Sequence, residues 1–130
     1  MAGHAQNSWK GADVNLIEAY TRDKELKDRF LEAINTKAQI DAAIIGKPDR
    51  CVLGNWLHGE AERKCQFLKT YKPAVEAHTA FHVQAAKVVK LINGREYDDA
   101  QAAVADGSAF AKALLNLGVA LAKLKSEAKM

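Results

Sequence analysis

The sequence predicts an all-α protein, an antiparallel four-helix bundle with an additional short helix that carries a cysteine. No stretch alternates β-branched and polar residues as a strand would, whereas alanine and leucine, which favour helices, are frequent. Apolar residues recur at helical spacing, and turn signals divide the chain into segments joined by short loops. Three long helices with shorter pieces between them are typical of helix bundles.

Turn residues set the expected helix boundaries. The expected segments are Val14–Ile45, Arg50–His58, an irregular helical stretch at 60–72, Pro73–Asn93 and Tyr97–Lys125. The first ends at the turn sequence GKP at 46–48, and Asp49 is a favourable N-cap for the second, which Gly59 ends. Pro73 suits a first helical turn, and Gly94 suits a C-cap. We expect the sequence DGS at 106–108 to interrupt the last helix. That helix carries the apolar stripe Phe110, Leu114, Leu117, Leu121 and Leu124.

Length and composition favour one domain without disulfide staples. The chain has 130 residues, of which 48% are hydrophobic, so it can bury a core. Residues 1–13 read as a disordered lead-in and residues 14–127 as the domain. The net charge is only +3, and lysine and arginine alternate with acidic residues along most of the chain. No apolar run has the roughly 18 residues that span a bilayer. We therefore expect no nucleic-acid partner and no direct membrane insertion.

Two histidines on one helix face are the first candidate ligands. His78 and His82 are four residues apart, so both imidazoles lie on one side of a helix, one turn apart. They fall on the apolar stripe Val75, His78, His82, Ala85, Val89 and Ile92, and we expect both to point into the core. A buried imidazole needs a hydrogen bond or a metal, so either a structural network or a metal site fits this pattern.

Cys51 is the third candidate ligand. It lies in the first turn of the expected short helix, where unpaired backbone N–H groups favour a thiolate. Leu53, Trp56 and Leu57 would anchor that helix to the core. Two imidazoles and a thiolate suit tetrahedral zinc, although Cys51 could equally be a small buried residue.

The remaining cysteine and histidines are weaker candidates. We expect His58 to be an exposed residue at the end of the short helix and Cys65 to be structural. His4 lies in the lead-in. With two cysteines, too few for a disulfide framework, a reducing compartment is the default expectation.

Two stretches of the chain resemble the signatures of a known family. CVLGNWLHGE, from Cys51, resembles the pattern C-x-L-G-x-W-L-x-G-E of the chemoreceptor zinc-binding domain (CZB) family, and HTAFHVQAAKVV, from His78, resembles its H-x-x-F-H-x-x-A signature. The resemblance covers roughly Phe30 to Leu124. It implies a bacterial sensory four-helix bundle that binds one zinc through one cysteine and three histidines. Carried over by position, Cys51, His78 and His82 are three of these ligands.

The fourth family ligand has no counterpart in this reading. The family places a histidine on the first helix in a context like A-I-x-x-H-x-x-W-K, and on the stretch Ala33–Asp41 this position holds Lys37. A shift of one turn puts Ala33 there instead. Water, Asp41 or a residue near Lys37 could complete the site, or zinc could be lost. One rotation of the helix buries Phe30, Ile34, Lys37, Asp41 and Ile44, and the other buries Leu31, Ile34, Ala38, Ala42 and Ile45.

The function that the resemblance implies is sensing of zinc or of oxidants such as hypochlorous acid. The chain would act in bacterial signal transduction, as in a chemotaxis receptor or a diguanylate cyclase, with an attached or separate output domain and as a homodimer. Its expected location is the cytoplasm, or the periplasm if it belongs to a membrane receptor. The alternatives are a metal-free interaction or dimerisation domain and a bundle that binds haem between the two histidines. No acid–base pair, nucleophile triad or phosphate loop indicates an enzyme.

Overall fold

The computed structural model describes residues 16–45 and 52–130. Within these two ranges the chain forms helices and no strand, which confirms the predicted all-α class. The helices are α2 (Leu16–Thr36), α3 (Ala42–Ile45), α4 (Val52–Leu57), α5 (Glu60–Cys65), α6 (Tyr71–Asn93), α7 (Tyr97–Ala103) and α8 (Ala109–Glu127). The expected lead-in at 1–13 and the N-cap Asp49 lie outside the described residues.

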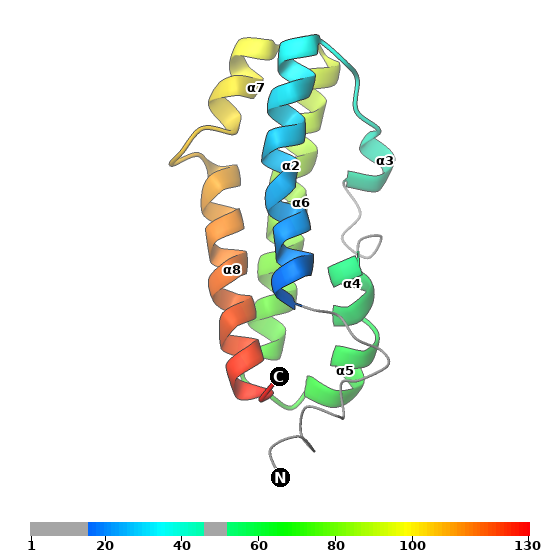
Figure 1. The fold of residues 1–130 in the computed structure, drawn as a ribbon, viewed down its shortest axis with the longest axis vertical. Coiled ribbons are helices and arrows are strands. Elements are labelled where there is room, and N and C mark those ends of the chain that lie inside the picture. Colours follow the sequence, from blue (N-terminus) through cyan, green and yellow to red (C-terminus); the bar gives the residue numbers. More distant parts are fainter. Residues whose placement is uncertain (1–15, 46–51) are drawn as a thin grey trace.

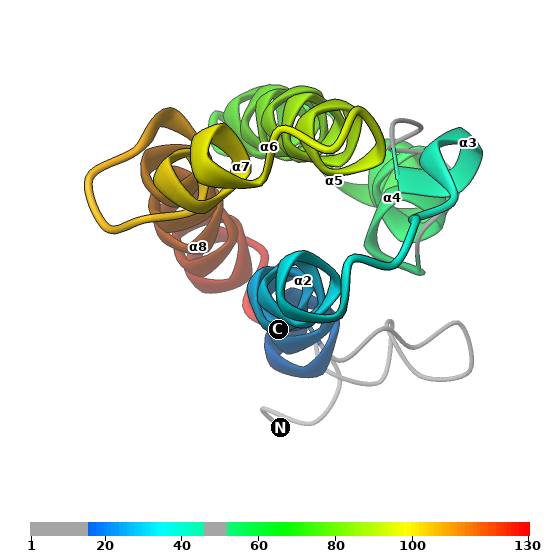
Figure 2. The same cartoon turned by 90° about the horizontal axis from the view of Figure 1, so that it is seen from above.

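Three long helices, α2, α6 and α8, form the frame of the molecule (Figure 1). The helix α7 lies beyond the start of α8, and the short helices α3, α4 and α5 follow one another along the opposite side. Seen from above, α2, α6, the α7–α8 pair and the α3–α5 group surround a common core (Figure 2). The buried faces of α2 and α6 therefore meet inside the molecule.

The first helix is shorter than the sequence predicts, because it ends at Thr36 and not at Ile45. Lys37 adopts a left-handed conformation with φ of 59°, and the Ala38 N–H donates to the Ala33 carbonyl at 3.0 Å. This is a Schellman cap formed by lysine in place of the usual glycine, so no glycine marks the end of the helix in the sequence. Neither predicted helix rotation across residues 37–45 is therefore correct.

The other predicted boundaries that fall on described residues agree closely with the structure, whereas Val14, Arg50 and the turn at 46–48 lie outside them. The helix α6 begins at Tyr71, two residues before Pro73, and Gly94 is its C-cap, although the left-handed residue there is Arg95, with φ of 62°. The expected interruption at 106–108 is confirmed, because the Ser108 side chain accepts a hydrogen bond from the Ala111 N–H and so caps α8. The predicted stripe of α8 is buried at Phe110, Leu117, Leu121 and Leu124 and half-buried at Leu114.

A cluster of phenylalanines joins the three long helices. Phe30 of α2, Phe81 of α6 and Phe110 of α8 are fully buried or nearly so. The Phe110 ring lies 5.7 Å from that of Phe30 and 5.4 Å from that of Phe81, between ring centroids. Burial of each ring stabilises the fold by roughly 1.5–3 kcal/mol. The Phe81 ring also packs edge-on against His82, so this cluster supports the histidine face of α6.

The short helices are anchored as the sequence predicts. Leu53, Trp56 and Leu57 of α4 are buried, and the Tyr71 hydroxyl donates to the Leu57 carbonyl at 2.7 Å. Cys65 at the end of α5 is fully buried, which agrees with a structural role. Among the described helices, none combines the length and the apolar character that a bilayer crossing requires.

Candidate metal centre

His78 and His82 both face the core from α6, as predicted. Their exposed fractions are 0% and 3%, and their two Nε2 atoms lie 3.1 Å apart. The rings are 4.5 Å apart between centroids and nearly perpendicular, at 75°. Two Nε2 atoms at this distance share one proton in a hydrogen bond, or they hold a cation between them.

The backbone of α3 fixes the tautomer of His82. Its Nδ1 lies 2.8 Å from the Ile45 carbonyl oxygen, and because a carbonyl only accepts, Nδ1 must carry the proton. Neutral His82 then presents a lone pair at Nε2, which is the form that ligates a metal. The hydrogen bond also holds the ring so that this lone pair points towards His78.

Asp23 of α2 completes the group, and the sequence reading missed it. Its side chain is buried, with Oδ2 3.7 Å from the His78 Nε2 atom. One ligand atom from each of Asp23, His78 and His82 lies within 4.8 Å of the other two. A signal was present in the sequence, because Asp23 falls on the buried stripe Leu16, Ala19, Asp23, Leu26 and Phe30.

The structure does not bring the expected fourth-ligand region to this group. Lys37 and Asp41 are both exposed, beyond the end of α2. The Lys37 ammonium instead lies 5.7 Å from the centre of the Tyr97 ring, a cation–π distance. The side chain of α2 that does lie in the buried group is Asp23, about four helix turns earlier in the chain.

Burial controls the charges of the three side chains. It raises the pKa of Asp23 from 3.8 to about 7, because a carboxylate there lacks solvation. Burial, followed by the neighbouring His82 and His58, lowers the pKa of His78 from 6.5 to about 3. Burial also lowers the pKa of His82, although its hydrogen bond to Ile45 acts in the opposite direction. Both imidazoles are thus neutral at pH 7, and the Asp23–His78 contact is not an ion pair.

The arrangement fits a small divalent cation. A tetrahedral zinc ion with bonds of about 2.0–2.1 Å holds its donor atoms about 3.3–3.4 Å apart. The observed separations of 3.1 Å and 3.7 Å bracket that spacing. Moreover, the buried Asp23 Oδ2 atom has no hydrogen-bond partner among the residues that the structure describes. A cation between the three side chains would satisfy this oxygen.

Of the other candidate residues, the two that the structure describes, His58 and Cys65, are not part of this group. Cys51 lies outside the described residues, directly before Val52, the first residue of α4. His58 is exposed, as expected. Cys65 is buried at a different place, and burial raises the pKa of its thiol, which keeps it protonated.

Asn93 holds the segment that supports His82. Its side-chain amide accepts from the Ile40 N–H and donates to the Ile40 carbonyl, both at 2.8 Å. We expect Asn93→Ala to lower the free energy of unfolding by about 1–3 kcal/mol, because two hydrogen bonds are lost. Urea unfolding measures this, with Asn116→Ala on the exposed face of α8 as the control. Equal stability of the two variants would show that the Asn93 amide does not anchor this segment.

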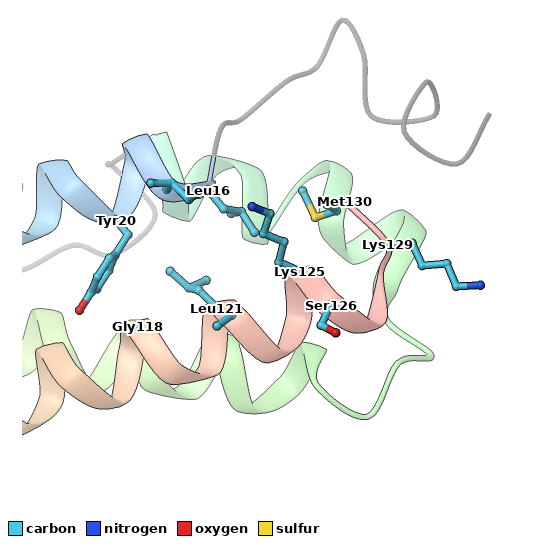
Figure 3. A pocket seen from close by; sticks show the side chains of 10 residues that line it. Leu16, Tyr20, Gly118, Leu121, Lys125, Ser126, Lys129 and Met130 are labelled. Carbon is cyan, nitrogen blue, oxygen red and sulfur yellow. The ribbon is translucent and has the colours of Figure 1, made fainter. Parts of the chain in front are cut away.

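A surface groove lies away from the buried group of Asp23, His78 and His82, and none of these three side chains lines it. It encloses about 450 Å³ between the start of α2 and the end of α8, where Tyr20, Gly118 and Leu121 line it (Figure 3).

Comparisons with protein-family models, with curated proteins and with solved structures find no match to the chain. The chemistry of the buried group must therefore carry the functional argument.

Proposed function

We propose that the chain is a zinc-binding sensory module of the chemoreceptor zinc-binding type. In this proposal Asp23, His78 and His82 hold the metal, and Cys51 supplies the fourth ligand. The bundle would have four sides, with α3, α4 and α5 taking the place of one continuous helix. The buried Asp23 Oδ2 atom beside two neutral imidazoles is the observation that carries the proposal.

A metal-free interaction or dimerisation domain is the main alternative. The contacts of His82 fit it, because one proton between the two Nε2 atoms and one on Nδ1 satisfy the ring. Asp23 does not fit it as well. Its buried Oδ2 atom has no hydrogen-bond partner among the described residues, which costs folding free energy, and an apolar residue would serve a metal-free core better. Asp23 therefore favours the metal site.

The donor set bears on which metal is bound. Two imidazoles and one carboxylate alone also suit non-haem iron, whereas an added thiolate favours zinc. Haem is less well supported, because two axial ligands lie on opposite sides of the iron. Here both Nε2 atoms come from adjacent turns of one helix and are 3.1 Å apart. Zinc is the metal that all four proposed ligands suit.

The proposed mechanism links the metal to helix packing. A metal held by Asp23 and the two histidines joins α2 to α6, and the His82–Ile45 hydrogen bond extends this link to α3. Loss of zinc would leave the Asp23 carboxyl group without this cation. Hypochlorous acid would convert a Cys51 thiolate to a sulfenic acid and release chloride, which removes one ligand. The repacking would pass to an attached or separate output domain, without an enzymatic step in this chain.

Metal content is the direct test. The protein is purified without a histidine tag and without added metal, and zinc and iron are measured by plasma emission spectroscopy. We expect about one zinc per chain, and much less in Asp23→Asn and Cys51→Ala. Asp28→Asn, an exposed change on the same helix, should retain the metal. A chain that takes up no zinc at micromolar concentrations would contradict the proposal, and iron in its place would change the assigned metal.

A further inference from the structure

One aromatic side chain stands out from the end of the molecule. Phe67 lies in the turn between α5 and α6 and is 87% exposed, the highest value among the large hydrophobic side chains that the structure describes. The turn is held in place, because the Leu68 N–H donates to the Cys65 carbonyl at 2.8 Å and Cys65 is buried. The exposure of Phe67 is therefore built into the turn.

Positively charged side chains surround this turn. Lys69 and Lys72 follow Phe67 in the sequence, and both are exposed. The end of α8 lies against the same turn, because Glu127 Oε1 accepts hydrogen bonds from the Thr70 N–H at 3.0 Å and from its hydroxyl at 2.6 Å. This contact brings Lys129, which is exposed, and Lys125, which is half-buried, to the same end, where both also line the groove.

We call the side chains of Phe67, Lys69, Lys72, Lys125 and Lys129 the basic end surface. Figure 1 shows the α5–α6 turn and the C-terminal end of α8 together at one end of the molecule. In Figure 3 the Lys129 side chain points outward, away from the groove beside it. The nearby acidic groups are Glu127, which is bonded to Thr70, and the exposed Glu62 and Glu76. These four lysines and three glutamates leave an excess of one positive charge among the side chains named at this end.

We propose that the basic end surface docks the protein on an anionic lipid membrane. Lysines attract acidic headgroups within about a Debye length, and a protruding aromatic ring enters the boundary between headgroups and acyl chains. The surface is a projecting tip with charges around it, which fits a plane. The groove beside this surface is lined mainly by apolar side chains, among them Leu16, Ile17 and Leu121, so it suits an acidic peptide poorly. This is adsorption at the surface and needs no membrane-spanning helix.

Vesicle binding tests the proposal. The full chain is mixed, in the presence of a chelator, with vesicles of phosphatidylcholine alone or with about 30 mol% phosphatidylserine, and bound protein is measured by co-sedimentation. We expect much tighter binding to the anionic vesicles, with a steep loss as salt is raised. Because a chelator is present, failure here would be separate from failure of the metal site.

Matched variants assign the binding to this surface. We expect Lys69→Glu with Lys72→Glu to weaken binding by about 100-fold and Phe67→Ser by about tenfold. Lys87→Glu with Lys112→Glu changes the net charge equally at exposed sites of α6 and α8 that lie farther from this end. Val83→Ser removes another exposed apolar side chain. Both controls should bind nearly as the unmodified chain does. Equal binding to both vesicle types would overturn the proposal. So would poly-glutamate binding that matches vesicle binding and ignores Phe67→Ser.

Discussion

Zinc is expected to raise the midpoint of thermal unfolding of this protein, and His78→Ala is expected to abolish that rise. A ligand that binds only the folded state at about 100 times its Kd adds about 2.7 kcal/mol to the free energy of unfolding. For a chain of this length that corresponds to a shift of about 10 °C. Scanning calorimetry with and without zinc measures it, and a chelator should reverse it.

The zinc-induced difference must be compared, and not the absolute midpoint. His78 is fully buried, so its truncation also leaves a cavity and lowers stability without any metal. Asn116→Ala changes an exposed position on α8 and should keep the full zinc response. A zinc shift in His78→Ala as large as in the unmodified chain would show that the metal binds elsewhere.

Sequence periodicity predicted the parts of the fold that depend on buried faces. The apolar stripe that contains His78 and His82 was sufficient to predict that both rings face the core, because a helix that exposed them would also expose Ala85 and Val89. The break before α8 followed from the short sequence around Ser108, whose capping is a local interaction. These features need only neighbours along the chain.

The end of the first helix depends on contacts that periodicity does not contain. Lys37 takes a conformation that usually belongs to glycine, and the chain beyond it is held by Asn93, which is 53 residues from Ile40 in the sequence. One of the two rotations predicted for a helix that continued past Thr36 placed Lys37 and Asp41 on a buried face, and the other left both in water. Because the helix ends at Thr36, both side chains are exposed and neither belongs to the buried group.

Asp23 was missed because a single acidic residue on an apolar stripe is easily read as a surface residue. Its partners, His78 and His82, are more than 50 residues away in the sequence, and only the packing of α2 on α6 brings the three together. The useful rule is that a charged residue in the middle of an otherwise buried stripe deserves the same weight as a histidine there.

Asp23→Asn is expected to stabilise the metal-free protein at alkaline pH and to weaken zinc binding. Burial raises the pKa of Asp23 from 3.8 to about 7, so the folded state favours the neutral acid. Its contribution to stability is therefore complete below about pH 3.8 and is lost as the pH rises to about 7. At about 1.36 kcal/mol per unit, a shift of about three units corresponds to roughly 4 kcal/mol as an upper limit. Asparagine carries no such charge.

The contribution of His78 to stability has the opposite pH dependence, so the Asp23→Asn substitution also changes how stability varies with pH in the acidic range. Its pKa falls from 6.5 to about 3 on burial, so its contribution is complete above pH 6.5 and is lost as the pH falls towards 3. In the metal-free unmodified chain the slopes of Asp23 and His78 oppose each other between about pH 4 and 6.5. In Asp23→Asn the opposing Asp23 slope is gone, and His78 and His82 act in the same direction, so stability should rise with pH across that window.

The unmodified chain and Asp23→Asn should exchange their order of stability when zinc is added. Without metal, Asp23→Asn is the more stable above pH 7, because it avoids burying a carboxylate. With zinc, the unmodified chain is the more stable, because the cation favours the ionised carboxyl group that the variant lacks. Urea unfolding at pH 8 with zinc and with a chelator measures both orders, with Asp28→Asn as the exposed control. A variant that is less stable without metal and keeps the full zinc response would mean that Asp23 serves the core alone.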